Sequence, residues 1–178
     1  MKKLTVKELN RISVEAFKQS EKLKVVVALD DVRSLYNVGS VFRTADAFRM
    51  EKVLLGGITA TPENQPVEIH KTALGAELSV DWEYCKDLMP AIERYKRDGY
   101  RIVSVEQVMN SIKLDKFVAE PDCGYVIIFG NEVKGVRQEI VDASHMALEI
   151  PQYGTKHSLN VSVSAGIVMW TFAQQLEC

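Results

Sequence analysis

The chain of 178 residues has few of the features that mark secreted, metal-binding or membrane proteins. Its three cysteines, Cys85, Cys123 and Cys178, are odd in number, far apart and outside any Cys-x-x-Cys pair. This argues against a disulfide framework and a zinc site, so we expect three free thiols. No apolar run reaches the length of a membrane span, and the N-terminus lacks the apolar core of a secretory signal. A cytoplasmic location is the default expectation.

The chain also lacks a strong net charge of either sign. Its formal charge of −2 excludes a protein that binds polyanions through bulk charge alone. The charge is uneven, however, because residues 1–24 hold seven basic side chains against three acidic ones. The pattern predicts a basic N-terminal helix at about 1–22. Such a helix could contact phosphates or could simply be a solvated amphipathic helix.

Two common nucleotide-binding fingerprints are missing. Neither Gly-x-Gly-x-x-Gly nor Gly-x-x-x-x-Gly-Lys-Ser/Thr occurs, which argues against dinucleotide-binding and P-loop sites of the usual kind. Internal repeats, low-complexity tracts and an interior linker are also lacking. The length fits one core, so we expect a single domain over 1–178.

Short apolar runs alternate with amphipathic segments, which is typical of an α/β fold with a mostly parallel sheet flanked by helices. The segment 59–78 reads as a long irregular excursion with one helical turn near Thr72, and 111–119 is ambiguous. We expect strands at 24–29, 52–55, 80–84, 101–105, 125–129 and 147–150, and helices at 38–48, 88–97, 137–143 and 160–176.

Three polar clusters interrupt these apolar elements, and each follows a predicted buried strand. The carboxyl ends of parallel strands share one edge of a sheet, so the clusters could converge on a single crevice. They are Asn37-x-Gly39-x-x-x-Arg43, Gly130-x-Glu132-x-x-Gly135, and the segment from Gly154 to Ser162.

Each cluster taken singly also has a structural interpretation. Asn37 could cap a helix, Arg43 could pair with Asp46 one turn on, and Glu132 could pair with Lys134. In the third cluster, either Ser158 or Asn160 could accept hydrogen bonds from the first amides of the last helix. One cap does not explain why five polar residues crowd the start of an otherwise apolar helix.

In this order, the three clusters closely resemble the three motifs of the SpoU/TrmH family of RNA ribose methyltransferases, in the SPOUT superfamily. The resemblance spans about residues 24–176. It implies an α/β domain whose C-terminal segment forms a deep trefoil knot that binds S-adenosylmethionine. It also implies that the protein acts on RNA, pairs into a homodimer through the knot region and needs no metal. The Asn-x-Gly-x-x-x-Arg segment matches the branch that methylates ribose rather than base.

The resemblance also implies roles for individual residues. The implied catalytic residues are Asn37, Arg43, Glu132, Ser158 and Asn160. The implied cofactor contacts are Ser104, Val105, Glu106, Phe129, Gly130, Asn131, Ile150, Gly154, Ser158 and Leu159. Candidates for contact with RNA are Arg43, His70, Lys71 and Lys156.

The role of Arg43 is open between a general base and a phosphate clamp. Using a guanidinium as base near neutral pH costs about 8 kcal/mol, and a phosphate contact favours the charged form further. We therefore interpret Arg43 as a clamp that positions the ribose. His157 is a chemically easier base, but the family does not demand histidine there, so we interpret it as a polar loop residue; His145 is predicted to be structural.

The substrate is predicted to be transfer or ribosomal RNA. Compact members without an appended RNA-binding domain often act on transfer RNA, which favours that class. Two alternatives remain: a knotted module that binds S-adenosylmethionine and RNA without turnover, and an α/β nucleotide-dependent transferase acting on a small molecule.

Overall fold

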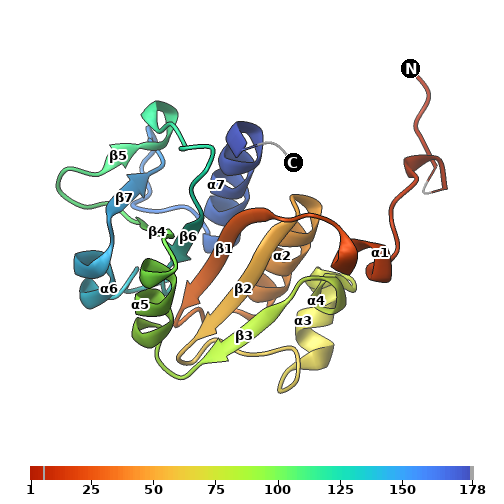
Figure 1. Cartoon of the computed structure of the whole chain (residues 1–178), viewed down its shortest axis with the longest axis horizontal. Coiled ribbons are helices and arrows are strands. Elements are labelled where there is room, and N and C mark those ends of the chain that lie inside the picture. Colours follow the sequence, from red (N-terminus) through yellow and green to blue (C-terminus); the bar gives the residue numbers. More distant parts are fainter. Residues whose placement is uncertain (6, 177–178) are drawn as a thin grey trace.

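Residues 1–5 and 7–176, described by a computed structural model, form a seven-stranded parallel sheet covered by helices on both faces (Figure 1). The strand order is β3-β2-β1-β6-β4-β7-β5. The predicted α/β fold with a mostly parallel sheet is confirmed. The strands are β1 (Leu23–Asp30), β2 (Met50–Gly56), β3 (Trp82–Cys85), β4 (Arg101–Val105), β5 (Ile112–Lys113), β6 (Tyr125–Phe129) and β7 (Met146–Glu149).

The helices form two layers with separate apolar cores. Helices α2, α3, α4 and α7 cover one face of the sheet, while α5 and α6 cover the other. No helix in the described part of the chain is long and apolar enough to cross a bilayer. The helices are α1 (Val14–Gln19), α2 (Leu35–Ala47), α3 (Pro66–Ala73), α4 (Ala76–Ser79), α5 (Met89–Arg97), α6 (Gln138–Ala143) and α7 (Val161–Leu176), with short 3₁₀ turns at Lys7–Leu9 and Leu114–Lys116.

The centre of the sheet is buried on both faces. Side chains at 25–29 of β1 and 126–128 of β6 have no exposed surface, and the two strands pair in register. This burial explains why both strands have continuous apolar sequences: successive side chains point to opposite faces of the sheet, and both faces are covered by protein. The rigid centre fixes where β1 and β6 end, and both ends lead into polar clusters.

The basic helix expected at about 1–22 is much shorter in the structure. Among residues 1–5 and 7–22, only those of α1 are α-helical. Ser13 caps the start of α1 by accepting a hydrogen bond from the Ala16 amide at 3.2 Å. Asn10 has a φ of 51°, which interrupts any helix running in from the 3₁₀ turn. Phe17 is the only buried residue of α1, so this segment has too small an apolar face to hold a longer helix.

The excursion at 59–78 contains two helices, α3 and α4, rather than one turn. Pro66 starts α3, and Leu74 ends it with a left-handed φ of 53°. Gly39 allows α2 to approach α3 closely, because a Cβ there would lie 2.2 Å from the Thr72 hydroxyl. The polar residues and prolines of this segment led to the prediction of an irregular loop. The helices form because they pack against α2, a contact that the local sequence does not indicate.

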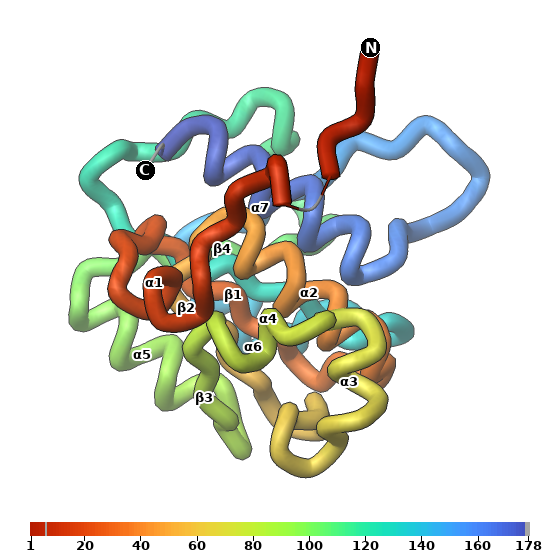
Figure 2. The backbone as a smooth tube through the Cα atoms, turned by 90° about the vertical axis from the view of Figure 1, so that its right-hand side faces the viewer, coloured from red at the N-terminus to blue at the C-terminus, as the bar shows by residue number. Residues whose placement is uncertain are grey.

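The last strand enters the sheet between two strands that are consecutive along the chain. β7 pairs with both β4 and β5, although β4 and β5 are joined directly by residues 106–111. After β7 the chain swings away from the body, in pale blue in Figure 2, and returns as α7. This insertion places the C-terminal segment inside the sheet rather than at its edge.

His145 precedes β7 and connects it to β4. Its Nδ1 accepts a hydrogen bond from the Ile102 amide at 2.8 Å, so the imidazole is neutral there. Burial, followed by the positive charges of Lys96 and Arg101, lowers the pKa of His145. The structural role predicted for His145 agrees with these contacts.

We expect this contact to make stability depend on pH. The unfolded chain binds the proton more readily, so His145 stabilises the fold above about pH 6.5, and that contribution is lost as the pH falls further. Urea unfolding at about pH 7.5 and about pH 5.5 should show a smaller loss of stability in His145→Asn, which keeps an acceptor without titrating. An unchanged pH dependence in this variant would contradict the assignment.

Candidate functional site

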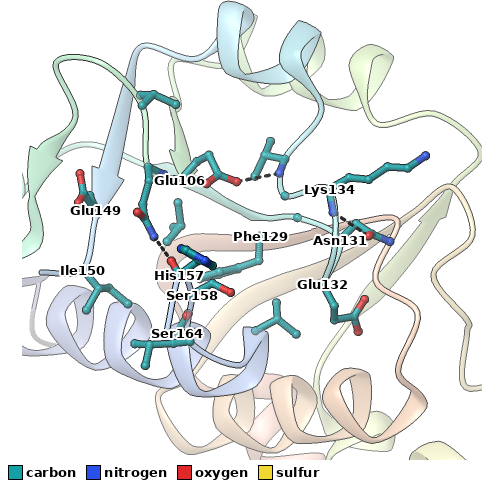
Figure 3. Close-up of a pocket in the computed structure, with 18 of the residues that line it drawn as sticks. Glu106, Phe129, Asn131, Glu132, Lys134, Glu149, Ile150, His157, Ser158 and Ser164 are labelled. Atoms are coloured by element: carbon teal, nitrogen blue, oxygen red, sulfur yellow. Dashed lines mark hydrogen bonds between the residues drawn. The ribbon is translucent and has the colours of Figure 1, made fainter. Parts of the chain in front are cut away.

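A hollow of about 690 Å³ opens at the carboxyl edge of the sheet, where β4, β6 and β7 end (Figure 3). Its walls come from residues 105–108, 129–136, 148–150 and 157–161. These loops carry the second and third polar clusters, while the first cluster approaches through Asn37. The size is in the range of pockets that hold cofactors.

The loop after β6 is closed by two glycines. Asn131 and Gly135 exchange two backbone hydrogen bonds, at 3.0 and 2.9 Å. A Cβ on Gly130 would lie 2.0 Å from the carbonyl carbon of Gly135, and Gly135 itself has a φ of 70°. Only glycine therefore suits residue 130 without moving the backbone, and the motif's Gly-x-x-x-x-Gly spacing is explained by this tight loop.

Glu106 and Gln107 join the three walls of the hollow. The Glu106 carboxylate accepts hydrogen bonds from the amides of Val136 at 3.0 Å and Gln107 at 2.8 Å. The Gln107 side chain donates to the carbonyl of His157 at 2.7 Å. The loops after β4, β6 and β7 thus hold one another in place before any ligand binds.

Glu132 connects the hollow to the loop between β1 and α2. Its carboxylate accepts hydrogen bonds from the amides of Arg33 at 3.0 Å and Ser34 at 2.9 Å, and from the Asn37 side chain at 3.1 Å. Burial opposes ionisation of this carboxyl, but the hydrogen bonds outweigh it and the pKa of Glu132 is lowered. Glu132 makes no ion pair with Lys134, so the alternative interpretation of this cluster was wrong.

Asn37 and Asn160 extend this network to the third cluster. The Asn160 amide donates to the Asn37 side-chain oxygen at 3.2 Å, and its own oxygen caps α7 by accepting from the Ser162 amide at 2.9 Å. Asn160 therefore serves both as cap and as part of the network. The cap of α2 is Ser34 rather than Asn37. Glu132, Asn37 and Asn160 form one chain of hydrogen bonds across all three clusters.

Arg43 lies apart from this chain. It is exposed on α2, and it makes no hydrogen bond or ion pair with any residue of 1–5 or 7–176. Asp46, its suggested partner, contacts the Ser79 hydroxyl instead. Six residues after Asn37 on the same helix, Arg43 points about a third of a turn away from it. Its guanidinium is available to a ligand, but it does not line the hollow.

Most of the residues with an implied cofactor role line the hollow, and two do not. Ser104 is fully buried, with its hydroxyl 2.8 Å from that of Ser144. Gly154 lies in an exposed loop, with nothing within 4 Å of where a Cβ would stand. Those that line it are Val105, Glu106, Phe129, Gly130, Asn131, Ile150, Ser158 and Leu159.

The candidate RNA contacts are spread over two surfaces. His70 and Lys71 lie on α3, where they pair with Glu77 at 2.5 Å and Glu68 at 2.6 Å. Lys156 is exposed in the loop before α7. Cys85 and Cys123 are free thiols, whereas Cys178 lies outside the described residues.

One interaction at the base of the site has no signal in the sequence. Arg137 donates from its backbone amide and its guanidinium to the Asp30 carboxylate, both at 2.9 Å, and also to Asp87 at 2.9 Å. Asp30 is 1% exposed, and burial raises its pKa despite the partner charge. The pair joins β1 to the loop after β6 across 107 residues of sequence, a distance at which no motif spacing could indicate contact.

The lining favours a cationic, partly apolar ligand over a polyphosphate. Three carboxylates line the hollow, from Glu106, Glu132 and Glu149, against a single lysine, Lys134. Val105, Leu148 and Ile150 supply apolar surface for a planar base. The carboxylates of the hollow are compatible with the positively charged sulfonium of S-adenosylmethionine, and the apolar side chains are compatible with its adenine. Within the described residues, no three His, Cys, Asp or Glu side chains are grouped to hold a metal.

Comparisons with known proteins agree with this chemistry. The model of the SpoU rRNA Methylase family matches residues 24–170. An uncharacterized tRNA/rRNA methyltransferase of Borreliella burgdorferi is 32% identical over 92% of this chain and 69% of its own length. A tRNA (guanosine(18)-2'-O)-methyltransferase of the same organism is 28% identical over 83% of this chain and 65% of its own.

Among solved structures, the AdoMet-bound rRNA methyltransferase of Sinorhizobium meliloti superimposes with a TM-score of 0.79 at 24% identity. The match covers 91% of this chain and 61% of that one. The chain thus spans between about three fifths and seven tenths of the length of these relatives.

The Glu132 network gives a direct prediction for stability. Glu132→Gln places an amide donor against backbone donors, which should lower the free energy of unfolding by about 1–3 kcal/mol. Chemical denaturation measures the loss. Glu93→Gln, at an exposed surface pair with Lys96, is the matched control and should change stability by less than about 0.5 kcal/mol. Equal effects of the two variants would show that Glu132 does not support the loops.

Proposed function

Because the chain belongs to the SpoU rRNA methylase family, we propose that it transfers a methyl group from S-adenosylmethionine to a ribose 2′-hydroxyl of RNA. The family match and the shared fold also confirm the predicted knotted α/β architecture. The observation that supports the activity most strongly is the hydrogen-bonded chain of Glu132, Asn37 and Asn160 beside the hollow.

S-adenosylmethionine supplies an activated methyl group when bound, and the chain must orient the hydroxyl that receives it. The hollow offers backbone groups from three interlocked loops, apolar side chains and carboxylates. Ser158 lies on its wall and Asn160 at its rim, where both can hydrogen bond to a ribose. The preformed loops reduce the reorganisation needed on binding.

Arg43 acts in this proposal as a phosphate clamp. Its exposed guanidinium has no partner in the described chain, and arginine matches the geometry of a phosphate with two parallel hydrogen bonds. Fixing the phosphate fixes the adjacent ribose. The ribose oxygen would bond to the methyl carbon as the carbon–sulfur bond breaks, a thioether would leave, and the hydroxyl proton would pass to solvent water. Asn37 and Asn160 are neutral members of the hydrogen-bond network that orients the site.

The proposed substrate class is transfer RNA. The relatives carry names that refer to transfer RNA, ribosomal RNA or both. Exposed basic side chains near the site, including Lys156 and Lys134, can contact phosphates of either. A compact catalytic surface suits a folded substrate that presents its target nucleotide on a loop, which favours transfer RNA.

The two rival functions fit the site less well. A binding module without turnover has no need of the complete set of Asn37, Glu132 and Asn160 held by mutual hydrogen bonds. A nucleotide-dependent transferase would need cationic contacts for phosphates, whereas the lining of the hollow carries three carboxylates and a single lysine.

We further propose that the chain forms a homodimer through α7. Helices α2 and α7 run side by side, joined at one end by Asn37 and Asn160 and at the other by the rings of Phe48 and Trp170, 5.5 Å apart. On the outer face of α7, Val163, Ile167 and Trp170 are 50%, 38% and 51% exposed. This apolar stripe borders the outer face of α2, so pairing would bring Arg43 beside the second copy.

Arg43→Ala should lower methyl transfer to transfer RNA by about 100-fold or more while leaving the affinity for S-adenosylmethionine within a few fold. Scintillation counting of methyl transfer and calorimetric titration of the cofactor measure the two effects. Arg97→Ala, at an exposed position on the opposite face, is the matched control. Near-normal turnover in Arg43→Ala would overturn the assignment.

Ile167→Asp should convert the dimer to a monomer, because it places a charge in the centre of the apolar stripe. Size-exclusion chromatography with light scattering measures the mass. Val67→Asp changes a 68% exposed residue of α3, a helix that packs against α2 and α4, and should leave the mass unaltered. A monomeric wild-type protein, or a dimeric Ile167→Asp variant, would contradict pairing through this face.

A further inference from the structure

A second hollow of about 560 Å³ lies at the same carboxyl edge of the sheet, beyond the end of β2. One wall is formed by Trp82 and Tyr84 of the edge strand β3, and the other by the loop of residues 57–64. Trp82 and Tyr84 are two residues apart, so both side chains project from the same face of the strand. Tyr84 is 49% exposed, although aromatic rings of this size usually contribute to a core.

The loop facing these rings is held by its own hydrogen bonds. The Thr61 amide donates to the Asn64 side chain at 2.9 Å, and the Asn64 amide donates to the Thr61 hydroxyl at 3.2 Å. The Tyr84 hydroxyl donates to the Gly57 carbonyl at 3.0 Å, which fixes its ring against the loop. The hollow is therefore a preformed slot with aromatic surface.

The polar groups at its rim restrict the ligand. No lysine, arginine or histidine lines the slot, which argues against a phosphate or another anion. Glu63 is exposed at the rim and makes no hydrogen bond or ion pair with the residues that the structure describes. A planar group with two adjacent hydrogen-bond donors fits the aromatic wall and the free carboxylate. Guanine presents such donors on its Watson–Crick edge.

The slot is joined to the cofactor hollow by the loop between β1 and α2. On one side, Asp31 accepts a hydrogen bond from the Ile58 amide at 2.9 Å. On the other, the Asp31 carbonyl accepts from the Asn131 side chain at 2.7 Å, and the Arg33 amide donates to Glu132. The exposed Arg33 side chain lies on this loop and has no partner in 1–5 or 7–176, so it can contact a phosphate between the two sites.

We propose that the Trp82 and Tyr84 slot holds an unpaired guanine base of the RNA substrate, close in sequence to the methylated nucleotide. The base stacks on the aromatic wall and donates to Glu63, while Arg33 contacts the backbone that leads to the cofactor hollow. This inference rests on the proposed function for its ligand class. The slot would be a second base-binding site, which selects the RNA by a nucleotide other than the one that is methylated.

The test uses the fluorescence of Trp82. Trp170→Phe leaves Trp82 as the only tryptophan of the chain. In that background the pentaribonucleotide UUGUU should quench the emission and bind about 10-fold more tightly than UUAUU. Tyr84→Leu should weaken binding of UUGUU by about 10-fold, because stacking is lost. Tyr84→Phe keeps the ring and loses only the hydrogen bond to Gly57, so it should bind within about threefold of the parent. Glu63→Gln should remove the preference for guanine.

Binding needs no S-adenosylmethionine, so its outcome is separable from catalysis. Absence of quenching at oligonucleotide concentrations up to about 1 mM, equal binding of the two sequences, or unaltered binding in Tyr84→Leu would overturn the guanine slot. Methyl transfer to transfer RNA, measured in parallel, should show a raised KM in Tyr84→Leu with an unchanged affinity for S-adenosylmethionine. Quenching in the Trp170→Phe protein together with no methyl transfer by the wild-type protein would refute the proposed function and leave the slot intact.

Discussion

The three hydrogen bonds donated to the Glu132 carboxylate hold together the two halves of the site. One half is the loop that closes the cofactor hollow, and the other is the start of α2, which carries Asn37 and Arg43. A carboxylate is suited to this place because it accepts several hydrogen bonds and donates none. Its lowered pKa shows that these bonds outweigh the cost of burying the charge.

This arrangement separates binding from positioning. The hollow is built from loops after β4, β6 and β7, which fix one another through Glu106 and Gln107. Arg43 and Arg33, which are proposed to contact RNA phosphates, belong to α2 and to the loop before it. These two segments connect to the hollow through Glu132, Asn131 and Asn160. A shift in either half is transmitted to the other through these side chains, so methyl donor and acceptor stay aligned.

The sequence predicts the central sheet and the convergence of the clusters well, because both depend on local patterns. The apolar runs of β1 and β6 indicate that these strands are buried, and the spacing of the glycines indicates the tight loop at Gly130. Local sequence patterns do not predict features of the structure that depend on contacts between segments far apart in the chain. The N-terminal helix has too little buried surface to extend, α3 depends on its approach to Gly39, and the Asp30 and Arg137 pair spans 107 residues of sequence. The placement of Ser104 beneath the hollow follows from strand register, which sequence does not specify.

The proposed role of the Glu132 network is to align a ribose hydroxyl, rather than a base, with the methyl donor. Mass spectrometry of nucleosides from unmodified transfer RNA incubated with the protein and S-adenosylmethionine tests this claim directly. We expect one new nucleoside whose added methyl group remains on the sugar fragment. A methyl group found on the base fragment, or no methylated nucleoside with either transfer or ribosomal RNA, would contradict it.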